Sequence, residues 1–365
     1  MRQYAPVDRQ DIAVSSRDPE VLREALGSWL ATKRDGAAIT SFHKPEGNGM
    51  SSETVLFDAR WDGEDHALVA RIAPADVDVP VFRTYDMDMQ FRVMQLVAER
   101  SDTPVPECLW NEPGADVIGS PFFVMRRVDG HVPPDNLPYT FEGWVLDASP
   151  ADRIAMQDDT VWALAGIHSV ALDGVDLGFL GHDPSGPSAL RQHVDEWADY
   201  YRWLGLDEPI PVVDDAFAWL EAHWPVDDGG VPVLSWGDSR IGNVIYDGFR
   251  PAAVLDWEMA SIGPRGLDVG WMAYIHDFFQ DVAEQMGLPG LPGFMQVDDL
   301  AETYEARTGI TITDRQFWKV FAALRYGLIM ARIHQRQVAF GEVEPSDDPE
   351  AGVMHRDWLR SAIDA

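Results

Sequence analysis

Hydrophobic and polar positions follow two different spacings along the chain, and the change between them divides the sequence. The first part is dominated by strand-like runs. These runs cover residues 37–43, 52–61, 66–73, 106–110 and 120–128. Because short, turn-rich connections join the first three, they predict an antiparallel meander. Helical spacing predicts helices over 21–32 and 81–100, and the prolines of TPVP (103–106) end the second one.

From about residue 130 the spacing is mainly helical. The predicted helices cover residues 151–172, 187–204, 213–224, 266–281, 297–308 and 315–340. Two short strand-like runs, 244–246 and 252–257, interrupt them and are joined by DGFRP, which predicts a hairpin. The patterns therefore predict an α+β fold with a small β-rich lobe over 1–128 and a large helical lobe over 129–365. A cleft between two lobes is a common place for a ligand.

Composition and charge exclude several classes of protein. The formal net charge is −33 and no Lys- or Arg-rich run exists, which argues against a nucleic-acid or anionic-membrane partner. Cys108 is the only cysteine, so no intramolecular disulfide forms. The first residues lack the apolar core of a signal peptide, and no run approaches the roughly 18 apolar residues of a membrane span. We therefore expect a cytoplasmic protein.

The strongest chemical signal is the segment GDSRIGNVIYDGFRPAAVLDWE, residues 237–258. Asp238 lies in the loop before the hairpin, and the hairpin returns Asp256 close to Asn243. Carboxylate and amide oxygens suit Mg²⁺, which takes one or two carboxylates and completes its shell with phosphate oxygens. We expect Asn243 and Asp256 to hold the metal, and Asp238, off the hairpin, to be free to orient a hydroxyl group and accept its proton. The structural alternative is an ordinary turn followed by a strand end.

This segment resembles the aminoglycoside phosphotransferase-like family of small-molecule kinases, whose motifs read HGD-x-x-x-x-N and then I/L-D-W-E. The later segments IGPRGLDVGW (262–271) and TYEARTGI (303–310) match the family's pattern as well, and the resemblance runs from about residue 30 to 340. It implies a protein-kinase-like two-lobed fold. It also implies transfer of phosphate from ATP, with Mg²⁺, to a small hydroxylated acceptor.

The resemblance assigns nucleotide binding to the small lobe. The loop PEGNGMSSET (45–54) would cover the phosphates with backbone amides, although alone it reads as a hairpin turn. The residues in question are Gly47, Asn48, Gly49, Ser51 and Ser52. Arg71 would pair with a phosphate as a bidentate donor, the alternative being a surface arginine on an edge strand. Backbone groups of Met125, Arg126 and Val128, on the strand that crosses between lobes, would meet the adenine.

Two positions depart from the family's pattern. Trp236 precedes the GD pair where the family usually has His, and because Trp offers one donor and no acceptor the loop must be held differently. Gln90 falls where a Glu often pairs with the small-lobe cation. These departures leave a non-catalytic ATP-binding pseudokinase or scaffold as an alternative. A second alternative keeps the chemistry but takes hydroxyacyl thioesters as acceptors.

Two further polar residues are given structural roles. Asp268 stands at the start of a predicted helix, and the resemblance implies that it braces the catalytic loop through backbone amides. His168 lies within an apolar helix and is expected to be a packed, hydrogen-bonded core histidine.

Overall fold

The structure, a computed structural model, describes residues 17–45, 52–74 and 80–364. Contacts between residues divide the chain into two compact units. Unit 1 is formed by the described residues of Met1–Phe91 and Glu107–Arg127, and unit 2 by those of Arg92–Pro106 and Val128–Ala365.

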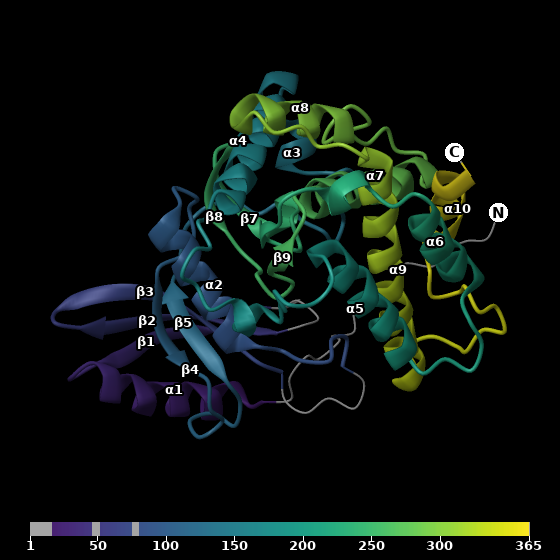
Figure 1. The fold of residues 1–365 in the computed structure, drawn as a ribbon. Coiled ribbons are helices and arrows are strands. Elements are labelled where there is room, and N and C mark those ends of the chain that lie inside the picture. Colours follow the sequence, from purple (N-terminus) through teal and green to yellow (C-terminus); the bar gives the residue numbers. More distant parts are fainter. Residues whose placement is uncertain (1–16, 46–51, 75–79, 365) are drawn as a thin grey trace. The chain divides into compact units, whose positions relative to one another are not determined.

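Unit 1 is built on an antiparallel sheet (Figure 1). Its strands are β1 (Ala38–His43), β2 (Glu53–Trp61), β3 (Glu64–Ile72), β4 (Cys108–Glu112) and β5 (Phe122–Arg126). They pair in the order β1-β2-β3-β5-β4, every neighbour antiparallel, so the predicted meander is confirmed. Because β3 lies between β2 and β5, Arg71 is not on an edge strand, and that alternative interpretation is wrong.

One face of this sheet packs against helix α1 (Pro19–Lys33). The helix begins at Asp18, whose carboxylate accepts hydrogen bonds from the backbone N–H groups of Glu20 and Val21 and so caps the first turn. The buried cluster between helix and sheet includes Leu22, Leu26, Leu30, Leu68, Ala70 and Ile72. Successive strand residues point to opposite faces, so Arg71 lies on the face turned away from this cluster.

Helix α2 (Met87–Arg100) begins later than the predicted residue 81, although Tyr85 continues the helical spacing. The hydroxyl of Tyr85 accepts from the backbone N–H groups of Val81 and Phe82, at 3.0 and 3.2 Å, which holds this segment in a non-helical turn. The carboxylate of Asp86 then accepts from Met89 N at 2.8 Å and satisfies a donor of the first helical turn.

Unit 2 is mainly helical. Its helices are α3 (Trp144–Asp147), α4 (Pro150–His168), α5 (Ala189–Trp203), α6 (Pro211–Ala222), α7 (Gly266–Gln285), α8 (Val297–Thr308), α9 (Arg315–Ala339) and α10 (Arg356–Asp364), with 3₁₀ turns η1 (Leu177–Leu180), η2 (Val226–Gly229) and η3 (Ile241–Asn243). All the helices predicted from spacing are present, whereas the short α3 and α10 were not predicted. Helices α7 and α9 pack side by side (Figure 1) and bury most of their apolar residues.

Four short strands in unit 2 position the segment 237–258. They are β6 (Val233–Ser235), β7 (Val244–Asp247), β8 (Arg250–Val254) and β9 (Ser261–Gly263). Strands β7 and β8 form the predicted hairpin, but β8 ends at Val254 because Asp256 adopts a left-handed conformation with φ +56°. Strands β6 and β9 also pair, so the loop and the hairpin are bracketed by a second pair of strands before α7 begins.

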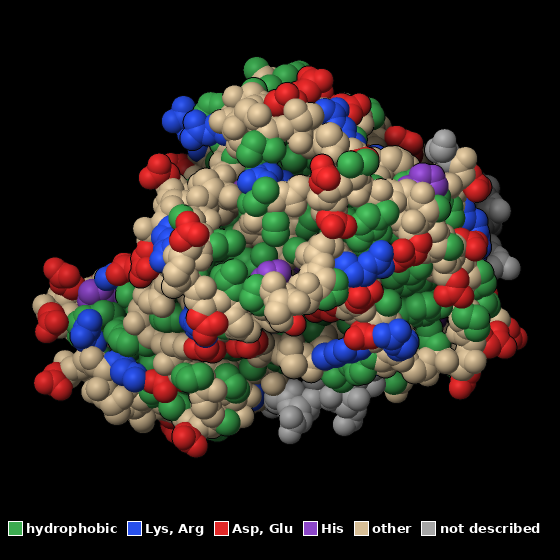
Figure 2. Space-filling view, viewed as in Figure 1, with side chains coloured by type: hydrophobic (Ala, Val, Ile, Leu, Met, Phe, Trp, Pro, Cys, Tyr) green, Lys and Arg blue, Asp and Glu red, His purple; other side chains and the backbone are tan. Residues whose placement is uncertain are grey.

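The acidic composition is visible on the surface. Figure 2 shows Asp and Glu side chains spread over the visible face, with Lys and Arg side chains scattered among them. None of the helices in the described part of the chain is long and apolar enough to cross a membrane.

Candidate active site

The loop between β6 and η3 requires a glycine immediately before Asp238. Gly237 has φ +93°, and a Cβ atom there would lie 2.1 Å from the carbonyl oxygen of Met259. Both the left-handed backbone and the close approach exclude a larger residue. The sharp turn at Gly237 sets the direction in which Asp238 leaves the strand.

The carboxylate of Asp238 is held by three side-chain donors. Its Oδ2 accepts from Asn243 Nδ2 at 2.6 Å and from Arg240 Nε at 3.1 Å, and its Oδ1 accepts from Trp271 Nε1 at 2.6 Å. Its side chain is 15% exposed. From the sequence we expected Asp238 to be free of the hairpin. In the structure it is instead hydrogen-bonded to the hairpin through Asn243.

The hairpin brings the backbone of Asn243 beside Leu255, the residue that precedes Asp256. Val244 pairs with Val254, and the backbone N–H of Leu255 donates to the carbonyl oxygen of Asn243 at 2.8 Å. The amide nitrogen of Asn243 donates to the backbone oxygen of Asp238 at 3.0 Å as well as to its carboxylate. Both hydrogens of this amide are thus used within the loop, and its Oδ1 is the atom left to bind a cation.

Arg240 and Asp135 belong to this site but were not predicted. The Arg240 guanidinium joins the two carboxylates, with Nη1 2.5 Å from Asp135 Oδ2 and Nε 3.1 Å from Asp238 Oδ2. Burial alone would lower the pKa of Arg240, but Asp238 and Asp135 raise it above its usual value, so the cation persists. The position of Arg240 inside the GDSRIGN motif was a usable signal, whereas Asp135 lies in a proline-containing connection and gave none.

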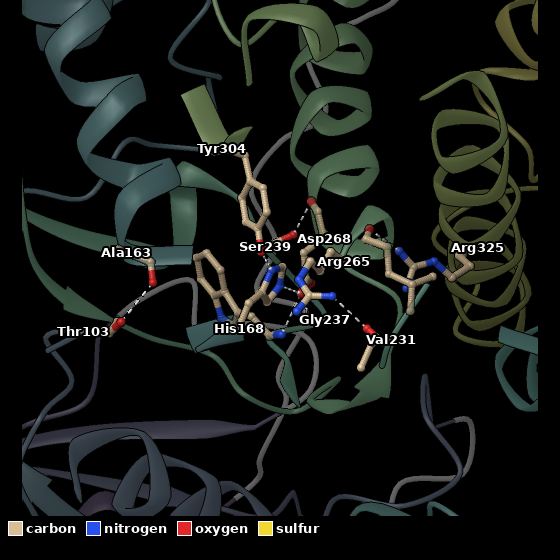
Figure 3. Close-up of polar contacts among 12 residues, drawn as sticks. Thr103, Ala163, His168, Val231, Gly237, Ser239, Arg265, Asp268, Tyr304 and Arg325 are labelled. Atoms are coloured by element: carbon tan, nitrogen blue, oxygen red, sulfur yellow. Dashed lines mark hydrogen bonds and ion pairs between the residues drawn. The ribbon is translucent and has the colours of Figure 1, made fainter. Parts of the chain in front are cut away.

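Behind the loop, Asp268 accepts hydrogen bonds from the backbone N–H groups of Trp236 and Gly237 at 3.0 and 2.8 Å. His168 Nε2 lies 2.9 Å from the same carboxylate, and its Nδ1 lies 2.9 Å from the hydroxyl of Tyr304 (Figure 3). We call Asp268, His168 and these two amides the Asp268 brace. It confirms the structural roles expected for both side chains.

Electrostatics keep the carboxylate of the brace ionised. Burial raises the pKa of Asp268, but hydrogen bonds from His168, Gly237 and Ser235, with the charge of His168, outweigh it and hold that pKa below the usual value. Ser239 Oγ donates to the backbone oxygen of Asp268 at 2.7 Å, so the loop is fixed on both sides of Asp238 (Figure 3).

Trp236, which replaces the family's usual His, takes up a bracing role. Its side chain is 1% exposed, and its indole N–H lies within hydrogen-bonding distance of two carbonyl oxygens, those of Leu255 at 2.8 Å and Asp256 at 3.2 Å. The single donor of Trp236 thus holds the backbone at Asp256, where the left-handed conformation needs support.

The residues predicted to bind nucleotide lie in or beside unit 1. Gly47, Asn48, Gly49 and Ser51 lie outside the described residues, and Ser52 is buried. Arg71 is half-buried and donates to Thr54 Oγ1 at 3.1 Å, across the β2–β3 ladder. Its guanidinium therefore emerges on the sheet face opposite α1.

The crossing strand β5 shares that face. Met125 pairs with Val69 and lies on the same face as Arg71. The backbone N–H of Arg126 donates to Glu107 O at 2.9 Å, and its side chain pairs with the Glu107 carboxylate. This N–H, which belongs to one of the residues predicted to meet the adenine, is thus engaged within the sheet.

Solved structures share the fold of this chain. The structure matches the crystal structure of a putative aminoglycoside phosphotransferase from Ralstonia eutropha JMP134 with a TM-score of 0.65 and 24% identity, covering 93% of this chain and 96% of that one. It also matches a thermostable mutant of aminoglycoside phosphotransferase APH(4)-Ia in ternary complex with AMP-PNP and hygromycin B, with a TM-score of 0.58, 18% identity and coverage of 93% and 98%. The chain thus has the two-lobed, protein-kinase-like fold of these phosphotransferases.

Family membership follows from the sequence match. The model of the phosphotransferase enzyme family matches residues 47–305, and this chain belongs to that family. Curated relatives include probable acyl-CoA dehydrogenase IBR3 of Arabidopsis thaliana, 26% identical over 87% of this chain and 39% of that protein. Acyl-CoA dehydrogenase family member 10 of Mus musculus is 26% identical over 82% of this chain and 27% of its own length. The chain spans less than two fifths of either relative.

Proposed function

We propose that this chain transfers the γ-phosphate of ATP, with Mg²⁺, to a hydroxyl group of a small molecule. The observation that carries the proposal is the constellation at the hairpin, where Asp238 is hydrogen-bonded to Asn243 and the segment of Asp256 is bonded back to Asn243. In this proposal Asp238 orients the acceptor hydroxyl and accepts its proton. The transition state of phosphoryl transfer is loose, so positioning and charge supply most of the catalysis.

The chemistry of the donor set fits a magnesium ion. Asn243 offers an amide oxygen and Asp256 a carboxylate, both hard ligands. Within the described residues, no group of three or more His, Cys, Asp or Glu side chains is arranged to hold a metal. Those residues therefore do not form a metal site made of protein ligands alone. Mg²⁺ commonly binds through one or two protein oxygens plus phosphate oxygens and water. When bound, it would neutralise charge on the phosphates.

The nucleotide contacts proposed for unit 1 centre on Arg71. It is a half-buried cation on the sheet face away from α1, and the segment that contains Gly47 and Gly49 lies just before β2, its partner strand. A guanidinium on a rigid central strand is well suited to bidentate pairing with phosphate.

The acceptor class is the finer part of the proposal. Aminoglycosides and macrolides are named for the structural neighbours, whereas the curated relatives are named for acyl-CoA dehydrogenases. A cavity of about 10 Å³ beside the loop that carries Asp238, lined by Arg240 and Gly242 as well as by apolar side chains, is the size of one water molecule and does not choose between these classes. A hydroxyacyl thioester is the second candidate acceptor, next to an aminoglycoside-like one, because of the names of the curated relatives.

The experiment that tests the proposal measures ATP binding and phosphate transfer together. Titration calorimetry of wild type should show tight ATP binding only with Mg²⁺ present, and the Asp256→Ala variant should lose this metal dependence. Asp247→Ala is the matched control, because Asp247 is an exposed carboxylate at the tip of the same hairpin. Unchanged Mg²⁺-dependent binding in Asp256→Ala would overturn the metal assignment.

Transfer itself is measured by ³¹P NMR with aminoglycosides and hydroxyacyl thioesters as acceptors. Detection of a phosphorylated acceptor would support the proposed phosphotransferase activity. ATP binding without transfer or hydrolysis on either class of compound would favour the scaffold alternative.

A further inference from the structure

The two oxygens of the Asp238 carboxylate are not equivalent. A carboxylate accepts about four hydrogen bonds, two at each oxygen. Oδ2 accepts from Asn243 and Arg240, whereas Oδ1 accepts from Trp271 alone within the part of the chain that the structure describes. The open acceptor position therefore belongs to Oδ1, and its direction depends on Trp271.

Trp271 is itself held from the opposite side by a cation. It lies on α7 and is 2% exposed, and its indole N–H is its only polar group. The guanidinium carbon of Arg325, on α9, lies 4.5 Å from the centroid of the Trp271 ring and 5.2 Å from that of Phe321. Such a cation–π contact is strongest where water is excluded, as it is here.

Arg325 is an unusual buried charge. It is 3% exposed, and its Nε has no hydrogen-bond partner among the described residues, where Asp268, the carboxylate nearest in its electrostatics, pairs with His168 instead. Its remaining polar contact is a long one, 3.4 Å from Nη2 to the backbone oxygen of Leu267. Burial lowers the pKa of Arg325 to about 10, against the opposing charges of Asp268 and Asp238, so it is a cation at neutral pH. A buried charge without an ion pair destabilises a fold, and stability alone does not account for it.

We infer that Trp271 and Arg325 are positioning residues for the transfer reaction. The indole N–H turns Oδ1 of Asp238 toward the acceptor hydroxyl, and Arg325 fixes the ring and polarises its N–H. This inference rests on the proposed function of Asp238. In the step, the hydroxyl proton passes to Oδ1, the hydroxyl oxygen forms a bond to the γ-phosphorus, and the bond from that phosphorus to the leaving ADP oxygen breaks.

The first test is Trp271→Phe, which keeps a ring against Arg325 but removes the N–H. Loss of a hydrogen bond to a charged group should lower kcat by about 10–100-fold, with the KM for ATP and the thermal midpoint close to wild type. Trp318→Phe is the matched control, because Trp318 is 3% exposed and its indole donates to Thr313 O at 2.8 Å, away from Asp238. A Trp271→Phe enzyme with the kcat of wild type would overturn the inference.

The second test substitutes Arg325. If Trp271→Phe is less stable than its control, this second test decides whether the pair has a positioning role. Arg325→Met should lower kcat by roughly 3–30-fold without lowering the thermal midpoint, because a cation–π contact is lost while an unpaired buried charge is removed. Arg325→Lys, which restores the cation, should recover part of the loss. Equal kcat values in Arg325→Met and wild type would contradict a positioning role.

A double-mutant cycle separates this inference from the proposed function. If Trp271 acts through Asp238, adding Trp271→Phe to Asp238→Asn should cause no further loss of transfer. Independent losses would overturn the inference. If Asp238→Asn alone leaves transfer intact, the proposed function fails. If Asp238→Asn abolishes transfer while the Trp271 and Arg325 variants keep wild-type kcat, only the positioning role fails.

Discussion

Asp238, in the loop between β6 and η3, and Asp268, behind that loop on α7, are both carboxylates, yet their surroundings differ in kind. Asp268 is fully buried and accepts from two consecutive backbone amides, from His168 and from Ser235. Asp238 is partly exposed and accepts only from side chains, those of Asn243, Arg240 and Trp271. Asp268 has its acceptor positions filled, whereas Asp238 keeps one open.

The contrast shows how one residue type can be fixed completely in one place and keep an oxygen open to a ligand in another. Backbone donors of adjacent residues move only when the loop itself moves, so Asp268 and the loop are rigid together. Side-chain donors fix the direction of Asp238 while leaving an oxygen exposed to a ligand. The rigid loop that Asp268 holds is what gives the carboxylate of Asp238 a fixed position.

The largest expected effect comes from placing asparagine at each position in turn. Asp268→Asn replaces an acceptor with an amide that turns donors toward the donors already there, and it should lower the free energy of unfolding by about 3 kcal/mol. Asp238→Asn keeps Oδ1 as an acceptor but turns its amide toward Asn243 and Arg240, and because this side chain is partly exposed the loss should be smaller, about 1–2 kcal/mol. Urea unfolding of both variants measures the two free energies of unfolding. Equal losses would contradict the different roles of Asp268 and Asp238.

An effect of similar size is expected from pH, through His193. This histidine is buried, and its Nε2 lies 3.2 Å from Ile262 O on β9, the strand that pairs with β6 ahead of the loop. Burial, with the charge of Arg325, lowers the pKa of His193 from 6.5 to about 4. The unfolded chain binds this proton first, so stability is complete above about pH 6.5 and falls by up to about 3 kcal/mol as the pH drops to 4.

The measurement is urea unfolding at pH 7 and pH 4.5. His193→Gln, which keeps a donor for Ile262 O, should lose less stability on acidification than wild type. His223→Gln, at an exposed position, should behave as wild type. The pKa of Asp268 lies below its usual value, so the carboxylate of the brace remains ionised throughout this window. Identical pH dependence in His193→Gln and wild type would contradict the assignment to His193.

The smallest expected effect tests the link from the brace to Asp256. Trp236→Phe keeps the ring but removes the indole N–H that holds the carbonyl oxygens of Leu255 and Asp256. Mg²⁺-dependent ATP binding should weaken by roughly 3–10-fold, the equivalent of about one hydrogen bond. Calorimetric titration measures it, and an unaltered affinity would show that Asp256 needs no support from Trp236.

The local part of the site was predictable from the sequence, because Asp238, Asn243 and Asp256 lie in one segment whose hairpin brings them together. The donors that hold Asp238 from outside the segment were not. Trp271 comes from the middle of α7 and Asp135 from an irregular connection, and no spacing rule relates either to Asp238.

The fold shows the same division. Long periodic helices such as α8 and α9 were predicted nearly to the residue, whereas the three-residue strands β6 and β9 are too short to carry a pattern. The start of α2 was misplaced because Tyr85 fits the helical spacing while its hydroxyl caps a turn. The central position of β3 shows that Arg71 is not on an edge strand. This position depends on pairing with β5, a strand distant in sequence, and the hydrophobic periodicity of a strand does not predict its pairing partners.

The central claim is that Asp238 acts on the acceptor while Asn243 and Asp256 serve the metal. The most direct test measures ATP affinity and phosphate transfer on the same Asp238→Asn protein. We predict ATP binding in the presence of Mg²⁺ close to wild type, with transfer to the acceptor lowered by ~10²–10⁴, the usual span for loss of a general base. Loss of Mg²⁺-dependent ATP binding in Asp238→Asn, or transfer at the wild-type rate, would contradict the account.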